Sequence, residues 1–213
     1  MHHRISRLLP VLLLSLLFLT PAHAEIVGQT LTDDYIHRVV ADNGQTLYFV
    51  SSEEDPVLYY EDVNFDGLND AVVLTTRGAS NFFYQCFLSD GAQYVFCPLR
   101  LCNYNLDAEH KIVTSFEDGG LAGGLHTTLL YRFDGMTPVL LREAKGAEKE
   151  AWSFDTQGYT VQRYSNMLTL MVWAYSPDGE ATCVFEQDVS TEDETALTTA
   201  LQAEENALWA DLR

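Results

Sequence analysis

Basic residues are scarce in this sequence. Its 213 residues contain 12 Lys and Arg but 31 Asp and Glu, which gives a formal net charge of −19 at pH 7. A nucleic-acid-binding surface needs basic side chains for the phosphates, and docking on anionic lipid needs them too. The composition therefore argues against both kinds of partner and favours cations or basic proteins. Acidic surfaces also keep exported proteins soluble, so charge alone does not identify a partner.

Recognisable catalytic motifs are also lacking. The sequence has no Gly-x-Ser-x-Gly nucleophile elbow, no His-Glu-x-x-His zinc motif and no phosphate-binding glycine loop. His37, His110 and His126 are scattered along the chain, and acidic pairs such as Glu117 and Asp118 carry little information in so acidic a protein. We therefore expect no enzyme activity and a protein that acts by binding.

Long apolar runs are confined to the N-terminus. Arg4 and Arg7 precede an apolar run at residues 8–19, and Ala22-His23-Ala24 follows it. This order is typical of a cleaved export signal, and the run is too short for a resident membrane span. We expect a signal peptide over residues 1–24 and an extracytoplasmic protein, periplasmic or secreted, with no membrane segment after cleavage.

Four cysteines follow, namely Cys86, Cys97, Cys102 and Cys183. An even number in an exported protein suggests disulfides, although the sequence leaves all three pairings open. A hairpin with its loop at residues 90–93 would place Cys86 opposite Cys97 and leave Cys102 for Cys183. Zinc binding is the alternative, but no Cys-x-x-Cys pair supports it.

Short apolar segments separated by Gly, Asp, Asn and Pro predict an all-β domain over residues 25–189. We expect a propeller-like or multi-sheet antiparallel arrangement. Asp-Gly pairs recur at 66, 90, 134 and 178, and a spacing of 44 residues is typical of propeller blades. The charged residues 145–150 are interpreted as a connector between strands.

The last segment, residues 190–213, predicts an amphipathic helix. Its apolar residues recur at helical spacing and are Leu197, Leu201, Leu208, Trp209 and Leu212. Thr191 with Glu194 three residues later matches a capping box. We expect a helix over residues 192–211, with the apolar stripe packed on the β domain and the acidic residues in solvent.

The most informative stretch is residues 62–70. Asp62, Asn64 and Asp66 alternate, Leu68 would add its backbone carbonyl, and Asp70 follows at the ninth position. Oxygen ligands in this number suit Ca²⁺. Gly67 stands at the sixth position, where the chain must turn sharply.

The flanks of this stretch distinguish it from an EF-hand. An EF-hand carries Glu at the twelfth position and a helix on each side, whereas here Val73 occupies that position between short apolar runs. The sequence therefore predicts a calcium loop between two strands. An ordinary Asn/Asp/Gly turn is the alternative.

Residues 117–124 form the most glycine-rich segment. Gly119, Gly120, Gly123 and Gly124 predict a flexible, protruding loop that would contact a protein partner. A solvent-exposed connector without a partner would have the same composition.

The pattern Asp62-x-Asn64-x-Asp66-Gly67-x-x-Asp70 between strands resembles the calcium loops of FG-GAP and VCBS-type β-propeller repeats. The order of residues 60–67, 101–107 and 111–115, then a glycine-rich turn and Tyr131, resembles a family of exported bacterial proteins. That family includes calcium-binding lysozyme inhibitors and immunity proteins against lysozyme-like effectors. The resemblance covers roughly residues 35–145, a domain-sized match.

This resemblance implies a propeller-like fold, one structural Ca²⁺ and a blocking loop that contains Gly119 and Gly120. The sequence departs from the inhibitors' Ser-Gly-x-x-Tyr loop, because Ser115 is followed by Phe116-Glu117-Asp118. The expected partner is a basic, lysozyme-like muramidase, and the protein is expected to be a monomer. The alternative is a cell-surface or extracellular module that binds glycan or protein.

Overall fold

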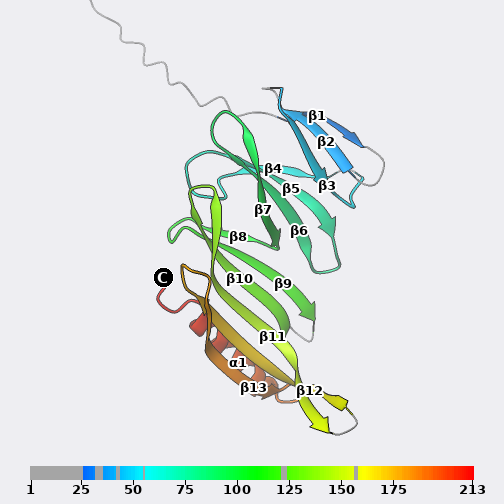
Figure 1. The fold of residues 1–213 in the computed structure, drawn as a ribbon, viewed down its shortest axis with the longest axis vertical. Helices are drawn as coiled ribbons and strands as arrows, with labels where there is room; N and C mark the ends of the chain where they lie inside the picture. The colour runs from blue at the N-terminus through cyan, green and yellow to red at the C-terminus, as the bar shows by residue number, and fades with distance from the viewer. Residues whose placement is uncertain (1–25, 32–35, 42–43, 55, 121–123, 156–157) are drawn as a thin grey trace, which may run out of the picture.

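The computed structural model describes residues 26–31, 36–41, 44–54, 56–120, 124–155 and 158–213. These residues form three antiparallel sheets and one C-terminal helix. The sheets follow one another along the long axis of the molecule in chain order (Figure 1). The predicted multi-sheet antiparallel β domain with a C-terminal helix is therefore confirmed. The expected signal peptide, residues 1–24, lies outside the described residues.

All three sheets are meanders, in which each strand pairs with its neighbour in sequence. The first sheet contains β1 (Ile26–Leu31), β2 (Ile36–Ala41) and β3 (Thr46–Val50). The second contains β4 (Leu58–Glu61), β5 (Asp70–Arg77), β6 (Phe82–Ser89) and β7 (Tyr94–Cys102). The third contains β8 (Asn105–Asp107), β9 (Ile112–Gly120), β10 (Leu125–Asp134), β11 (Thr137–Asp155), β12 (Gly158–Tyr175) and β13 (Ala181–Ser190).

The second sheet contributes to two hydrophobic clusters. Val73 packs with Leu47 and Phe49 of the first sheet, and its neighbour Val72 packs in a cluster with Val113 of the third sheet. Successive side chains of a strand point to opposite faces, so β5 serves both clusters. The first five residues of β5 are buried, which accounts for its nearly unbroken apolar sequence.

The recurring Asp-Gly pairs mark turns and not propeller blades. Gly67, Gly91, Gly135 and Gly179 have φ values between 59° and 90°, a region that glycine enters without strain. The first two turns connect strands of the second sheet, and the last two connect strands of the third. Since blades would carry one such turn at equivalent strands of separate sheets, the spacing of 44 residues reflects hairpin chemistry alone.

Residues 145–150 are not a connector. They lie within β11, where Lys145 pairs with Thr127 of β10 and Met171 of β12, and Glu148 pairs with Leu168. The prediction is wrong because backbone pairing with β10 and β12 holds this segment in a strand, although its side chains are charged. Lys149 also forms an ion pair with Asp188.

The C-terminal helix α1 (Glu194–Leu208) begins later than the capping-box pattern predicted. Its N-cap is Asp193, whose Oδ1 accepts a hydrogen bond from Ala196 N at 2.9 Å. Thr191 still belongs to the sheet side of the junction, because its N–H donates to the Asn166 carbonyl. No helix among the described ranges is long and apolar enough to cross a membrane.

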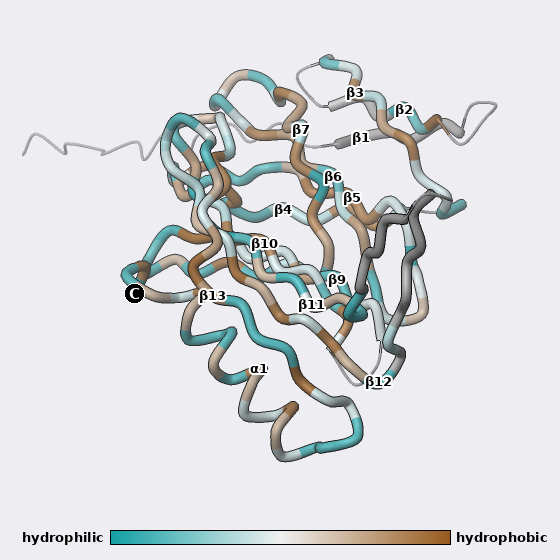
Figure 2. The backbone as a smooth tube through the Cα atoms, turned by 60° about the horizontal axis from the view of Figure 1, so that its bottom comes forward, coloured by the Kyte–Doolittle hydropathy of each residue, from teal (hydrophilic) through white to brown (hydrophobic). Residues whose placement is uncertain are grey.

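Helix α1 packs against β11, β12 and β13, as its apolar stripe predicted. Leu197 lies in a cluster with Leu168 and Leu170, and Leu208 lies in another with Val172. The helix alternates between hydrophilic and hydrophobic residues along its length (Figure 2). The expectation that all its acidic residues face solvent is wrong, because Glu204 is buried.

The four cysteines are free thiols in this structure. Cys86 and Cys97 share one core cluster, whereas Cys102 ends β7 and Cys183 is exposed on β13, in another sheet. The sequence left the pairing open, and none of the four cysteines is bridged in this structure. Burial raises the pKa of the Cys86 and Cys97 thiols, and raises that of Cys102 to about 11, which keeps them protonated and unreactive at neutral pH.

Candidate functional site

The loop between β4 and β5 is held in a tight conformation by hydrogen bonds from its backbone to its own aspartates. Asp62 accepts hydrogen bonds from Asp66 N at 3.0 Å and from Gly67 N at 2.8 Å. Asp66 Oδ1 in turn accepts from Leu68 N at 2.8 Å. Positive φ values at Phe65 and Gly67 complete the tight path. The residues predicted as ligands therefore share one compact loop.

Asn64 and Asp66 lie side by side in this loop. Asn64 Nδ2 donates to Asp66 Oδ2 at 2.9 Å, and Asn64 Oδ1 accepts from Asp66 N at 3.3 Å. The Asn64 amide nitrogen also lies 3.4 Å from the carbonyl oxygen of Gly135, in the turn between β10 and β11. The loop is thus attached to the third sheet as well as to its own strands.

Asp70 is the buried end of the loop. It is fully shielded from solvent, and its two oxygens accept from Val63 N and Ser89 N, each at 2.8 Å. Burial raises the pKa of this carboxyl to about 6, and the nearby charge of Asp66 contributes. Among the described residues, no Lys, Arg or His forms an ion pair with Asp70.

The donor set of the loop fits a calcium ion in its chemistry but is not preassembled. Carboxylate and carbonyl oxygens are hard ligands of the kind Ca²⁺ prefers. However, no three Asp, Glu, His or Cys side chains converge on a common point in the part of the chain that is described. The Asp62 carboxylate instead binds backbone N–H groups, and the Asn64 nitrogen points to Asp66. Calcium ligation by Asp62, Asn64, Asp66, Leu68 and Asp70 remains a prediction.

The glycine-rich segment is not a protruding loop where it is described. Gly119 and Gly120 belong to β9, and Gly124 is buried at the start of the next hairpin arm, while Gly123 lies outside the described residues. Asn81 anchors the segment, because its amide donates to the Asp118 carbonyl and accepts from Asp118 N, both at 2.8 Å. This anchor comes from 37 residues away, so local composition did not reveal it.

A groove between the first and second sheets exposes aromatic side chains that the sequence analysis did not single out. Its volume is about 450 Å³. Its lining includes Tyr48, Val50, Thr75, Tyr84, Phe96 and Arg100. No Asp or Glu contributes to this lining, although the chain as a whole is strongly acidic.

Two side chains of this groove contact aromatic rings of the second sheet. Tyr48, Val50 and Phe96 are 59, 68 and 56% exposed. The Phe96 ring meets the buried Phe87 edge-on, with 5.9 Å between ring centroids. The guanidinium of Arg100 lies 3.8 Å from the centre of the Phe83 ring. The sequence carries one signal for this groove, which is the apolar run in β3. This strand lies at the edge of its sheet, and no described sheet covers its outward-facing residues.

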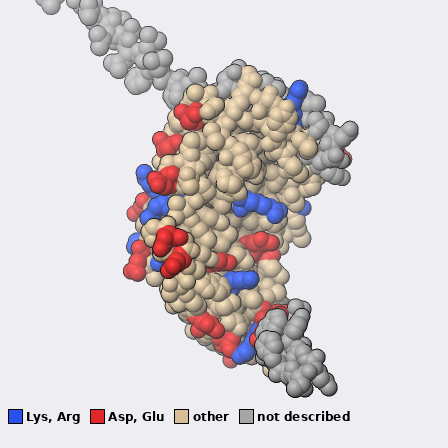
Figure 3. Space-filling model, in the orientation of Figure 1, with Lys and Arg blue, Asp and Glu red and all other residues tan. Residues whose placement is uncertain are grey.

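Charged side chains are distributed unevenly over the surface. On the face shown in Figure 3, acidic side chains lie mainly along one edge and in the lower half, and the centre of the upper half is mostly uncharged.

Comparisons of the sequence with family models and curated proteins, and of the structure with solved structures, find no match. The loop at residues 62–70 and the groove are therefore the two features that indicate a function.

Proposed function

We propose that this chain is an exported, calcium-binding protein that acts by holding a protein partner in the groove around Tyr48 and Phe96. The observation that carries the proposal is the gathering of exposed apolar side chains. Among the residues whose exposure the structure describes, four large apolar side chains are more than half exposed, namely Val50, Tyr48, Phe96 and Val184, and three of them line this one groove. Contiguous exposed apolar surface marks interaction sites.

The groove has the composition expected of an interface centre. Aromatic residues and arginine are enriched at protein–protein interfaces, whereas Asp, Glu and Lys are depleted from their centres. Tyr48, Tyr84, Phe96 and Arg100 match this pattern. The acidic residues elsewhere on the chain would then speed the approach of a basic partner.

A basic, lysozyme-like muramidase is the specific partner we propose. The support comes from the net charge of −19 and from the resemblance carried by residues 62–70. The groove would receive an apolar projection of the enzyme, and acidic groups around it would attract the basic surface. The glycine-rich segment is not needed for this contact.

The calcium part of the proposal is supported by Asp70. A fully buried carboxylate without a basic partner is costly, and a bound cation would offset that cost. Asp62, Asn64 and Asp66 supply further oxygens on the same loop. The ion would stabilise the connection between β4 and β5 and take no part in a reaction.

A turbidity assay with several muramidases on bacterial cell walls tests the proposal. The protein is expected to inhibit at least one enzyme near stoichiometric amounts, and Phe96→Ser to weaken inhibition by about tenfold or more. Val50→Ser and Val184→Ser form a matched pair, because both remove an exposed valine, and only the first is in the groove. Absence of inhibition at large molar excess would contradict the muramidase proposal.

A module that binds cell-surface glycan or protein is the second candidate. The exposed faces of Tyr48 and Tyr59 favour it, since aromatic rings provide flat apolar surface with a polar tip. Retention of the protein on peptidoglycan or polysaccharide, without enzyme inhibition, would support this candidate over the first.

A further inference from the structure

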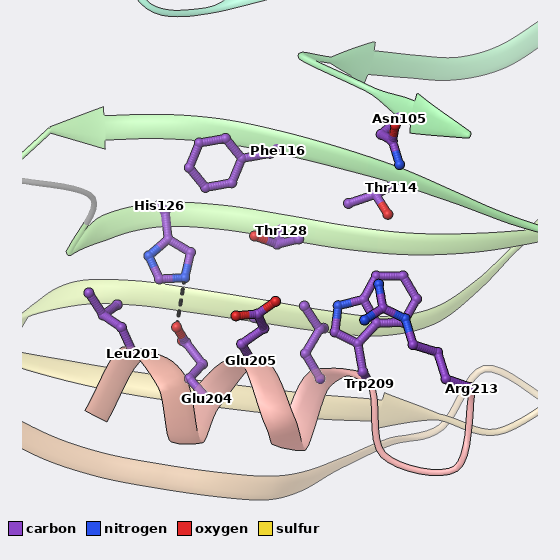
Figure 4. Close-up of a pocket in the computed structure, with 12 residues that line it drawn as sticks. Asn105, Thr114, Phe116, His126, Thr128, Leu201, Glu204, Glu205, Trp209 and Arg213 are labelled. Atoms are coloured by element: carbon purple, nitrogen blue, oxygen red, sulfur yellow. Dashed lines mark ion pairs between the residues drawn. The ribbon is translucent and has the colours of Figure 1, made fainter. Parts of the chain in front are cut away.

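A second cavity lies between α1 and the third sheet (Figure 4). Its volume is about 370 Å³, within the usual range of small-molecule sites. The helix packs over β11, β12 and β13, and the cavity opens beside it, over β8, β9 and β10. On one face of the third sheet, β11, β12 and β13 therefore pack against the helix, and β8, β9 and β10 form a wall of the cavity.

Strand register places polar side chains on the cavity wall. Thr128 pairs with Phe116 on one side and with Ala144 on the other, and Asn105 pairs with Thr114. All five residues line the cavity. No hydrogen bond of the Asn105, Thr114 or Thr128 side chains is found within the described residues, so these groups are available to a ligand.

A buried ion pair closes one end of the cavity. His126 Nε2 lies 3.0 Å from Glu204 Oε2, and the two side chains are 6 and 5% exposed. Phe116 stacks on the imidazole, with ring centroids 6.1 Å apart and planes inclined by 25°. Gly146 lies beside this pair, and a Cβ there would overlap the Gly124 carbonyl oxygen and lie 2.9 Å from His126 Nδ1.

Glu204 is incompletely satisfied. Its Oε1 is buried and has no hydrogen-bond partner among the described residues, whereas Oε2 faces His126. A buried acceptor without a donor is costly, so such groups call for an explanation. Since Glu204 lines the cavity, a ligand with a hydrogen-bond donor would supply the missing partner.

The other charges of the cavity restrict the ligand. Arg213 lies over the Trp209 ring, with 3.6 Å from guanidinium carbon to ring centre, so the cavity lining contains one permanently cationic group. Glu204 and Glu205 provide carboxylates in the same space. A ligand of either net charge would meet a like charge in this cavity, which favours a ligand without net charge.

We propose that this cavity binds a neutral, hydroxyl-rich small molecule of the saccharide class. Hydroxyl groups donate and accept, which suits the Thr114 and Thr128 hydroxyls and the Asn105 amide. One ligand hydroxyl donates to Glu204 Oε1, and the apolar side chains of Leu201 and Phe116 line the same cavity. The site is separate from the groove and does not depend on the protein-binding proposal.

Titration calorimetry of the protein tests this proposal with glucose, galactose, N-acetylglucosamine and cellobiose as probes, and with putrescine and acetate as charged comparisons. At least one saccharide is expected to bind with a dissociation constant at or below about 1 mM. Thr128→Val, which keeps shape and removes only the hydroxyl, and Glu204→Gln should each weaken binding by about tenfold or more. Glu194→Gln, on the exposed side of the same helix, should leave it unchanged.

The proposal is overturned if no saccharide binds in this range, if only putrescine or acetate binds, or if both cavity variants bind as the parent does. Thermal unfolding of each variant shows whether it is folded. Thr128→Val leaves the His126–Glu204 pair in place, so it decides the matter even if Glu204→Gln does not fold. Phe96→Ser should retain saccharide binding, which separates this site from the groove.

Discussion

Two buried carboxylates in this protein are held in opposite ways. Both oxygens of Asp70 accept backbone N–H groups, one from its own loop and one from the end of β6. Glu204 instead contacts a side chain, His126, through one oxygen, and its other oxygen has no hydrogen-bond partner in the described part of the chain. Backbone hydrogen bonds hold Asp70 in place within the fold, whereas Glu204 has one carboxylate oxygen that is available as an acceptor beside a cavity.

The difference indicates different uses for the two groups. A carboxylate saturated by backbone donors but without a basic partner suits a permanently bound cation, which interacts through charge. A carboxylate with one free acceptor in a cavity suits an exchangeable ligand with a hydrogen-bond donor. The following variants and conditions test whether Asp70 and the Glu204 cavity differ in this way.

Removal of Asp70 should have the largest effect on stability. Asp70→Ala leaves Val63 N and Ser89 N without acceptors, and we expect a loss on the order of 4 kcal/mol in the free energy of unfolding. Urea denaturation at neutral pH measures it. The exposed neighbour Asn69 provides the control, since Asn69→Ala should change stability by no more than about 0.5 kcal/mol. Equal effects of the two substitutions would contradict the assigned role.

The pH dependence of metal-free stability should follow Asp70. This carboxyl ionises at about 6 in the fold, against an ordinary value of 3.8, so the folded state holds the extra proton between these pH values. The contribution is fully present below pH 3.8 and is lost as pH rises through 6, at most about 3 kcal/mol in all. Urea unfolding in chelator across this range measures the slope, and Asp70→Asn should flatten it. A parent slope that Asp70→Asn leaves unchanged would assign the effect to other groups.

Substitution of Gly146 should have a smaller effect, centred on the cavity. A Cβ in Gly146→Ala would overlap the Gly124 carbonyl and press on His126 Nδ1, so we expect a loss of about 2 kcal/mol. Lys145→Ala, at the exposed neighbouring position, is the control. Thermal unfolding measures both, and parent-like stability of Gly146→Ala would show that His126 does not need this space.

Local patterns predicted the parts of this protein that local chemistry builds. The turn at Gly67, the final strand and the apolar face of α1 follow from residue types and spacing alone. The 62–70 pattern predicts Asp70 as a ligand, but the burial of Asp70 depends on the Ser89 backbone of another hairpin.

The remaining features depend on residues far apart in sequence. Asn81 holds Asp118, and Glu204 meets His126 only after the third sheet and α1 have packed. One signal for Glu204 was present, because it lies between Leu201 and Leu208 on the buried face of the helix. An acidic residue on an apolar face indicates a buried partner, which the histidine count alone could not identify.

The most direct test of the account is thermal unfolding of the protein in excess Ca²⁺ and in chelator, for the parent and for Asp66→Ala. With free Ca²⁺ a hundredfold above its dissociation constant, the parent should gain about 2.7 kcal/mol, and the variant should gain nothing. Equal melting of parent and variant in both solutions would contradict the calcium assignment and leave residues 62–70 as an ordinary turn.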